Sequence, residues 1–143
     1  MTVGCTPGGD YATWAAANGV DGVPSTTDSD GDGLQNGIEF VLGGDPSAPG
    51  SDSNALRPTI TVDATYLNFV FRRTDDSAGL APFVEYNSDL SAVWTEAEDG
   101  VNGVIIDEVD DGFGEGVDQV TVRIPRTLAN GAKAFARLHV DTP

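Results

Sequence analysis

Apolar and polar residues alternate with a period of two along most of the chain beyond residue 50, and turn-forming residues interrupt the alternation at short intervals. This pattern is typical of antiparallel strands that bury one face. It predicts six strands and a mainly β fold, an antiparallel β-sandwich of the jelly-roll or immunoglobulin-like kind. The apolar strand positions are Ile60, Val62 and Ala64; Leu67, Phe69 and Phe71; Val84 and Tyr86; the run at 104–106; Val120, Val122 and Ile124; and Ala136, Leu138 and Val140.

Two short helical patterns precede the strands. The first, at 10–18, begins with Asp10, a good N-cap residue, and ends before Gly19, a good C-cap residue. The second, at 34–42, places four apolar residues on one stripe and ends at a Gly-Gly-Asp-Pro sequence, which stops a helix. We expect Trp14 on the first helix to anchor that helix on the sandwich.

The sequence DSDGDGLQNGIE, at 28–39, fits the pattern D-x-[DN]-x-[DN]-G-x5-E of an EF-hand calcium loop at every position. Three carboxylates at alternate positions let the chain wrap a cation, and a glycine takes the sharp turn. Calcium accepts flexible oxygen coordination, whereas Mg²⁺ requires tighter octahedral geometry, so the loop favours Ca²⁺. The predicted ligands are Asp28, Asp30, Asp32, the backbone carbonyl of Leu34, Asn36 directly or through water, and Glu39 through both carboxylate oxygens.

The role expected of this ion is structural. A calcium sensor exposes a methionine-rich groove on binding, and this chain has one methionine, Met1. We therefore expect a bound calcium ion to hold the second helix in place against the first helix and the sandwich. A Pro- and Ser-rich stretch at 46–54 follows. We expect a helix–calcium loop–helix segment over 1–50 and the sandwich over 51–143, packed together as one compact unit.

The charge of the chain excludes several classes of partner. Its 143 residues include 23 acidic and 7 basic side chains, which gives a net charge of −16. Such a chain repels phosphate backbones and anionic lipids, and no apolar run approaches the ~18 residues that span a bilayer. We expect no nucleic-acid binding and no membrane insertion. The acid-rich stretch at 107–118 predicts a solvated turn between strands, with a second cation site as the alternative.

The same composition indicates where the protein works. Abundant acid and almost no lysine are typical of proteins in calcium-containing water outside the cell. The sequence MTVGCTPGGD at the start lacks the basic and apolar regions of a signal peptide. We therefore expect a secreted or cell-surface protein, seen as a fragment that lacks its signal peptide. The single cysteine, Cys5, cannot form an internal disulfide.

Catalytic patterns are sparse. The chain has one histidine, His139, and no G-x-S-x-G sequence, and Cys5 has no obvious catalytic partner. Carboxylates are abundant, but a short glycine-rich sandwich offers little room for a deep cleft. We expect no enzymatic activity and no catalytic residues.

Longer strings carry a family resemblance. The segment YATWAAANGVDG, followed by DSDGDGLQNGIEFVLGGDP, resembles the calcium-loop module found near the C-terminal ends of large secreted proteins of aquatic, polysaccharide-degrading bacteria. The strings LNFVFRRTDDSAGLAPFVEYNSDLSAVWTEA and KAFARLHV are similar to the same module. The loop itself resembles those of thrombospondin type 3 repeats and dockerins, although dockerins carry two. The resemblance implies a non-catalytic attachment, whose partner is the rest of a larger secreted protein.

Two functional hypotheses follow. The first is a carbohydrate-binding module that holds a polysaccharide-active enzyme on its substrate. The second is a structural spacer, a surface anchor or a protein-docking module with no glycan ligand. Exposed aromatic rings on one face favour the first, because sugar rings stack on them, whereas Trp94 buried in the core favours the second. The candidate sugar-binding residues are Trp94, Tyr66, Phe83 and Phe113.

Two groups of charged residues have structural interpretations. Glu85 and Arg137 lie on the polar positions of two strands, which predicts a cross-strand ion pair. Arg72 and Arg73 end an apolar strand just before the acidic pair at 75–76, so we expect local charge pairing there.

Overall fold

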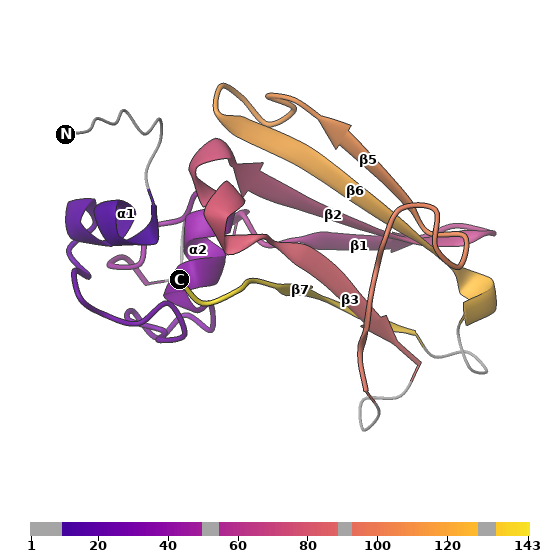
Figure 1. The fold of residues 1–143 in the computed structure, drawn as a ribbon, viewed down its shortest axis with the longest axis horizontal. Coiled ribbons are helices and arrows are strands. Elements are labelled where there is room, and N and C mark those ends of the chain that lie inside the picture. Colours follow the sequence, from indigo (N-terminus) through magenta and orange to yellow (C-terminus); the bar gives the residue numbers. More distant parts are fainter. Residues whose placement is uncertain (1–9, 50–54, 89–92, 129–133) are drawn as a thin grey trace.

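A computed structural model describes residues 10–49, 55–88, 93–128 and 134–143. It shows two antiparallel sheets packed face to face, with two short helices at one end (Figure 1). The prediction of a mainly β sandwich preceded by a small helical segment is confirmed. The predicted boundary between 1–50 and 51–143 lies at 50–54, outside the described residues, as do Cys5 and Lys133.

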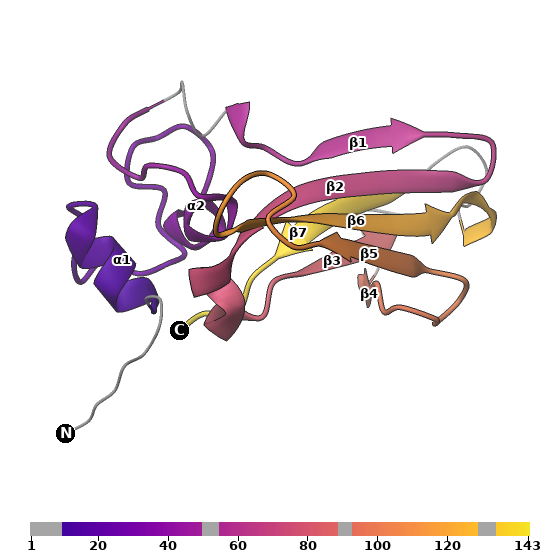
Figure 2. The same cartoon turned by 90° about the horizontal axis from the view of Figure 1, so that it is seen from above.

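The larger sheet has four strands, in the order β1-β2-β6-β5. They are β1 (Thr59–Val62), β2 (Tyr66–Thr74), β6 (Val117–Pro125) and β5 (Ile105–Val109). The nine-residue strands β2 and β6 pair along their whole length and form the centre of the sheet. Figure 2 shows β1 and β5 as its two edges.

The smaller sheet has three strands, in the order β4-β3-β7. They are β4 (Thr95–Glu96), β3 (Phe83–Asn87) and β7 (Phe135–His139). The described residues thus hold seven strands where the hydrophobic pattern predicts six, because β4 has only two residues and too few positions to show alternation. The combined order corresponds to strands A-B-E-D and C′-C-F of an immunoglobulin-type sandwich.

The core lies between the two sheets and follows the alternation in the sequence. On β2, buried residues alternate with half-buried ones, and β6 repeats this pattern in register. Pairs that face each other across the ladder, such as Phe69 and Val122, share the inner face. The other main buried residues of this core are Val41, Leu42, Leu67, Phe71, Val84, Ala97, Val104, Val120 and Ile124.

The helices are α1 (Tyr11–Ala17) and α2 (Asn36–Leu42), and both begin and end where local sequence dictates. The Asp10 carboxylate accepts a hydrogen bond from the Thr13 N–H and caps α1. Gly43 ends α2 with a φ of 83°, a left-handed conformation that favours glycine. Two 3₁₀ turns, η1 (Asp75–Leu80) and η2 (Arg126–Leu128), follow β2 and β6. No helix in the described ranges is long and apolar enough to cross a membrane.

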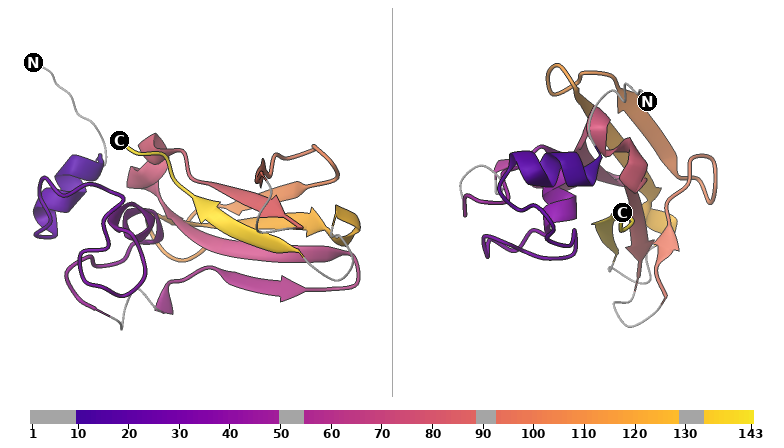
Figure 3. Two further views of the ribbon diagram at one scale, coloured as in Figure 1. Left: turned by 90° about the horizontal axis from the view of Figure 1, so that it is seen from below. Right: turned by 60° about the vertical axis from the view of Figure 1, so that its left-hand side comes forward.

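Helix α2 is attached to the sandwich by its C-terminal end (Figure 3). The Arg72 Nε donates to the Leu42 carbonyl at 3.1 Å, and the Thr74 hydroxyl donates to the Phe40 carbonyl at 2.8 Å. The Trp14 ring packs against Tyr11 and Phe40, with a centroid distance of 5.2 Å to Phe40. The same cluster includes Leu80, in η1 after β2, and Val140, so the expected contact of Trp14 with the sandwich is made through this cluster.

The expected pairing of two arginines with the acids at 75–76 is corrected. Arg73 bonds instead to Glu108 and Asp118, on β5 and β6. Arg72 bonds to the α2 carbonyl and lies over the Phe113 ring. Arg72 and Arg73 are consecutive residues of a strand, so their side chains point to opposite faces of the sheet and meet different partners.

Truncation of Phe40 tests the aromatic contact that joins the two helices. Its side chain is buried and touches the rings of both Tyr11 and Trp14. We expect Phe40→Ala to lower the free energy of unfolding by about 3–5 kcal/mol, as for other buried phenylalanines, measured by urea denaturation. Val93→Ala, at an exposed position, should change it by less than about 0.5 kcal/mol. A small effect of Phe40→Ala would contradict the role given to this cluster.

Candidate functional site

The acidic loop before α2 brings three carboxylates together. Oxygens of Asp28, Asp30 and Asp32 all lie within 4.8 Å of one another, which is a spacing that could hold a metal ion. Hydrogen bonds from backbone N–H groups to aspartate side chains within the loop fix its conformation. Asp28 accepts hydrogen bonds from the N–H groups of Gly31 and Gly33, at 2.8 and 2.9 Å, and Asp32 accepts one from Leu34 at 2.8 Å.

The turn at Gly33 depends on glycine. Its φ is 95°, in the region that side chains rarely adopt. Its N–H is also the main cause that lowers the pKa of Asp28 below its ordinary value, because the bond favours the charged carboxylate. The sequence pattern therefore produces the wrapped loop that it predicts.

The electrostatics of the loop favour a cation. The Oδ2 atoms of Asp30 and Asp32 are buried and accept no hydrogen bond from the described part of the chain. Burial raises the pKa of Asp30 above its ordinary value, and the charges of Asp32 and Asp28 add to this shift. Buried carboxylate oxygens without a donor are costly, and a bound cation removes that cost. The donor set is all oxygen, which fits a hard divalent ion.

The other three predicted ligands take different positions. Asn36 is fully buried and braces the loop, because its Oδ1 accepts from the Ser29 N–H and its Nδ2 donates to the Ser29 hydroxyl. Glu39, in the first turn of α2, is also fully buried but is not in the group of three close carboxylates. Leu34 contributes a buried side chain to the sandwich core.

Arg57 is a loop contact that the sequence analysis missed. Its guanidinium donates to the Asp32 carbonyl at 2.8 Å, and Arg57 lies just before β1. This bond connects the acidic loop to the first strand of the sandwich across 25 residues of sequence. No motif could reveal it, since a lone arginine after a Pro- and Ser-rich stretch has no characteristic spacing.

A second acidic group lies at the end of the larger sheet. Oxygens of Asp75, Asp110 and Asp118 come within 4.8 Å of one another, so this group too could hold a metal ion. Here, however, a protein cation is already in place. Arg73 lies 2.8 Å from Asp118, and this bond is the main cause that lowers the pKa of the Asp118 carboxyl. The stretch at 107–118 therefore forms a hairpin whose charge is partly balanced by Arg73.

The outer face of the smaller sheet gathers aromatic and polar side chains. Residues that pair across an antiparallel ladder lie on the same face, and Val84 and Leu138 are on the inner one. On β4, Glu96 pairs with Glu85, and Trp94 precedes it by two residues. The outward pairs of β3 and β7 are Phe83 with His139, Glu85 with Arg137, and Asn87 with Phe135.

The side chains on this outer face contact one another. The Arg137 Nε lies 2.7 Å from a Glu85 oxygen, so the predicted cross-strand pair is confirmed. The Arg137 guanidinium also lies over the Trp94 ring, 4.1 Å from its centroid. The Phe83 and His139 rings stack with centroids 4.7 Å apart. The result is a surface of rings and hydrogen-bonding groups held in place by strand pairing.

The four aromatic candidates do not form one line. Phe83 and Trp94 share the outer face of the smaller sheet. The Trp94 side chain is partly exposed and is not buried in the core. Tyr66 pairs with Pro125 on the larger sheet. Phe113 is 41% exposed in the hairpin between β5 and β6, beneath Arg72. Two further residues of this face, His139 opposite Phe83 and Phe135 opposite Asn87, were not predicted, because alternation alone does not give the register between strands.

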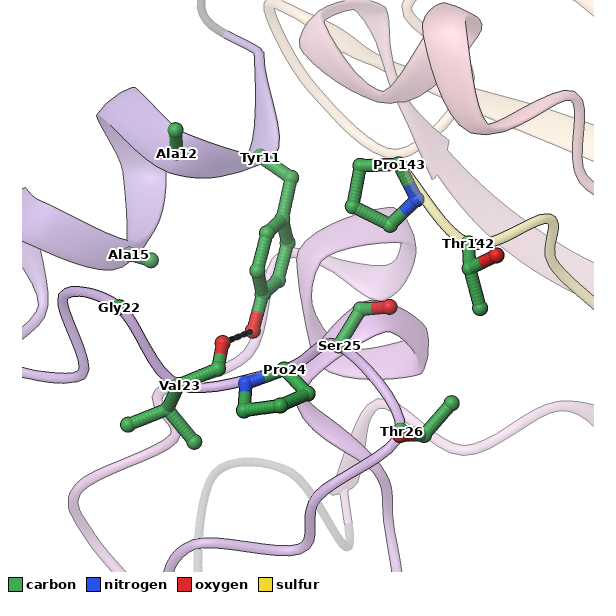
Figure 4. Close-up of a pocket in the computed structure, with 10 residues that line it drawn as sticks. All are labelled: Tyr11, Ala12, Ala15, Gly22, Val23, Pro24, Ser25, Thr26, Thr142 and Pro143. Carbon is green, nitrogen blue, oxygen red and sulfur yellow. Dashed lines mark hydrogen bonds between the residues drawn. The ribbon is translucent and has the colours of Figure 1, made fainter.

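A separate cavity of about 300 Å³ lies between α1, the loop at 22–26 and the C-terminal residues (Figure 4). It is at the small end of the range for ligand pockets, and its lining side chains are uncharged. The Tyr11 hydroxyl donates to the Val23 carbonyl at 3.0 Å, and burial raises the pKa of Tyr11. The cavity contains none of the predicted site residues.

Comparison of the chain with protein families, with curated proteins and with solved structures gives no match.

Metal binding by the loop can be measured directly. We expect isothermal titration of the metal-free protein with Ca²⁺ to show one strong site. The double variant Asp30→Ala, Glu39→Ala should abolish it, while Asp110→Ala at the second acidic group should leave it unchanged. Absence of heat in the parent protein, or full binding by the double variant, would contradict the assignment.

Chelation should also destabilise the fold. A ligand at a hundredfold excess over its Kd adds about 2.7 kcal/mol to the free energy of unfolding. For a chain of this size each kcal/mol corresponds to about 2–4 °C in Tm. We therefore expect EDTA to lower the Tm by roughly 5–10 °C in differential scanning calorimetry, with no change in the Asp30→Ala, Glu39→Ala variant. An identical Tm with and without EDTA would show that the ion does not support the fold.

Proposed function

We propose that this chain is a non-catalytic, calcium-stabilised accessory module of a secreted protein, and that it binds carbohydrate. The observation that carries the proposal is the outer face of the smaller sheet, where Phe83 and Trp94 lie beside Glu85, Asn87 and Arg137. Aromatic rings offer apolar surfaces to the C–H faces of sugars, and the carboxylate, amide and guanidinium groups are hydrogen-bonding partners for sugar hydroxyls.

Preorganisation supports this function. The face is built on paired strands, so its side chains keep their spacing without a ligand. Cross-strand bonds also hold Arg137 against Glu85. Stacking on one or two rings contributes only a few kcal/mol, and a Kd of ~1 mM corresponds to about −4.1 kcal/mol. We therefore expect micromolar to millimolar affinity for a polysaccharide.

Charge selects among glycans. The chain has a net charge of −16, and the Arg137 guanidinium on the proposed face is already paired with Glu85. Glu96, on the same face, is exposed. Sulfated or uronic polymers would meet like charges unless a cation bridges them. Neutral or cationic glycans are the ligands that this surface favours.

Calcium would stabilise the module at a distance from the glycan. Asp28, Asp30 and Asp32 are the residues that would hold it, with the buried Glu39 as the candidate to close the site. The bound ion would supply positive charge to carboxylates that otherwise repel one another. Its effect would reach the sandwich through α2, whose last turn bonds to β2.

The second candidate is a spacer or protein-docking module with no glycan ligand. One observation favours it: the Arg137 guanidinium covers one face of the Trp94 ring at 4.1 Å. A covered face cannot stack on a sugar. The carbohydrate proposal therefore needs the opposite face of Trp94, or Phe83, to make the contact.

Affinity electrophoresis against neutral, cationic and anionic polysaccharides decides between the two. We expect a neutral or cationic glycan to retard the protein, and Trp94→Ala or Phe83→Ala to weaken the retardation about tenfold. Phe113→Ala is the matched control, because Phe113 is exposed but belongs to the other sheet, and it should have no effect.

Retardation by none of the glycans would refute carbohydrate binding and leave the spacer or docking role. Equal losses with Phe113→Ala would place the ligand elsewhere. Strongest retardation by an anionic glycan in the presence of EDTA would overturn the charge argument.

A further inference from the structure

Arg57 connects the acidic loop to the edge strand β1. Its Nη2 atom donates to the Asp32 carbonyl at 2.8 Å and lies against Gly33, where an added Cβ would come within 3.4 Å of it. Pro58 separates Arg57 from the first residue of β1. A proline has a fixed φ and favours an extended residue before it, so the link from Arg57 to the strand is short and stiff.

Asp32, whose carbonyl accepts this bond, also belongs to the group of three close carboxylates. One of its oxygens lies within 4.8 Å of oxygens of Asp28 and Asp30. Its Oδ1 accepts from the Leu34 N–H at 2.8 Å, whereas its Oδ2 is buried and accepts no hydrogen bond from the described part of the chain. The bond from Arg57 therefore holds the backbone of a residue whose carboxylate has an oxygen left for a cation. Holding that backbone in place reduces the ordering that ion binding would otherwise require.

Strand β1 has little burial to hold it in place. All four of its residues are exposed, although they pair with β2. At its far end the Asp63 carboxylate closes the turn to β2, because it accepts from the N–H groups of Thr65 and Tyr66 at 2.8 and 2.7 Å. Its near end follows Arg57 directly. Segments with few buried contacts open locally at low cost, so the start of β1 depends on how firmly Arg57 is held.

We propose that Arg57 is a positioning residue for the cation of the acidic loop. It holds the Asp32 backbone in the conformation that binds the ion, and it transmits ion binding to the pairing of β1 with β2. The coupling is reciprocal, because a contact that an ion strengthens must in turn strengthen the binding of that ion. This inference rests on the calcium binding of the proposed function and does not depend on carbohydrate binding.

The charge of Arg57 has the opposite effect on the ion. A guanidinium repels a nearby divalent cation, so charge alone predicts that removal of Arg57 tightens calcium binding. Loss of the hydrogen bond frees the Asp32 backbone and predicts weaker binding. Arg57 is exposed, so water and salt screen the repulsion, whereas a hydrogen bond from a charged donor acts at contact distance. We expect the loss of the bond to dominate.

Calcium titration of Arg57 variants tests this sign. We expect Arg57→Gln to weaken calcium binding about tenfold, as for loss of a hydrogen bond from a charged donor. Arg57→Lys keeps a charged donor and should recover most of that loss. Arg123→Gln is the matched control for charge, because it removes an equal charge from β6, where Arg123 pairs with Asp107 at 3.2 Å. It should leave the Kd for calcium unchanged.

Two amides report on the pairing of β1. The Asp63 N–H donates to the Tyr66 carbonyl at 3.0 Å. Because residues of an antiparallel strand bond alternately to the two sides, the N–H groups of Thr61 and Thr59 donate to β2 as well. Their exchange with solvent, followed by NMR, therefore measures how often β1 separates from β2.

Amide exchange with and without calcium tests the transmission. Calcium should slow exchange at Thr59 and Thr61 about tenfold more than at the amides by which β5, the opposite edge strand, donates to β6. Comparison with β5 removes the part of the effect that comes from stability of the whole fold. In Arg57→Gln the difference between the two edges should disappear, and in Arg57→Lys it should largely return.

Unchanged or tighter calcium binding by Arg57→Gln would overturn the positioning role. A lower Tm of this variant with an unchanged Kd would make Arg57 a structural contact only. Equal effects of calcium on the β1 and β5 amides would overturn the transmission. Absence of calcium binding by the parent protein would overturn both this inference and the calcium part of the proposed function, whereas normal binding by the parent and by Arg57→Gln would overturn this inference alone.

Discussion

The attachment of α2 to both halves of the molecule is the constraint on which the rest of the structure depends. A helix of seven residues is too short to be stable alone. One side of α2 places Val41 and Leu42 in the sandwich core, while Phe40 holds the aromatic rings of α1. The acidic loop leads directly into its first turn, and its last carbonyls bond to β2. Loop, helix and sheet therefore share one set of contacts.

Under the proposed function, this arrangement separates stability from recognition. The acidic loop and α2 occupy one end of the sandwich, whereas Phe83, Trp94 and Arg137 lie on the outer face of the smaller sheet. Arg57 adds a second connection, from the loop to the segment just before β1. Under the proposed function, a cation in the loop would hold the scaffold that keeps the binding face rigid, without touching the ligand.

Local sequence patterns were sufficient to predict much of the fold and the conformation of the acidic loop. The alternation in 66–74 and 117–125 gives the two central strands, and the Asp and Gly spacing at 28–33 gives the wound acidic turn. Contacts between distant residues were not available from local patterns. The packing of Trp14 on Phe40, the bond from Arg57 to the loop, and the pairing of Arg73 with Asp118 all depend on how elements come together in space. The two-residue strand β4 was missed because it is fixed by pairing and not by its own pattern.

Cooperative unfolding with calcium tests the central claim most directly. The two tryptophans report different parts, since Trp14 packs in the helical cluster and Trp94 lies on the smaller sheet. Single-tryptophan proteins, Trp14→Phe and Trp94→Phe, can be unfolded in urea with calcium and with EDTA while fluorescence is followed. If α2 couples the loop to the sandwich, both probes will give one coincident transition, and calcium will move both to higher urea. A calcium-dependent shift seen by Trp14 alone, with the Trp94 transition unchanged, would contradict the account.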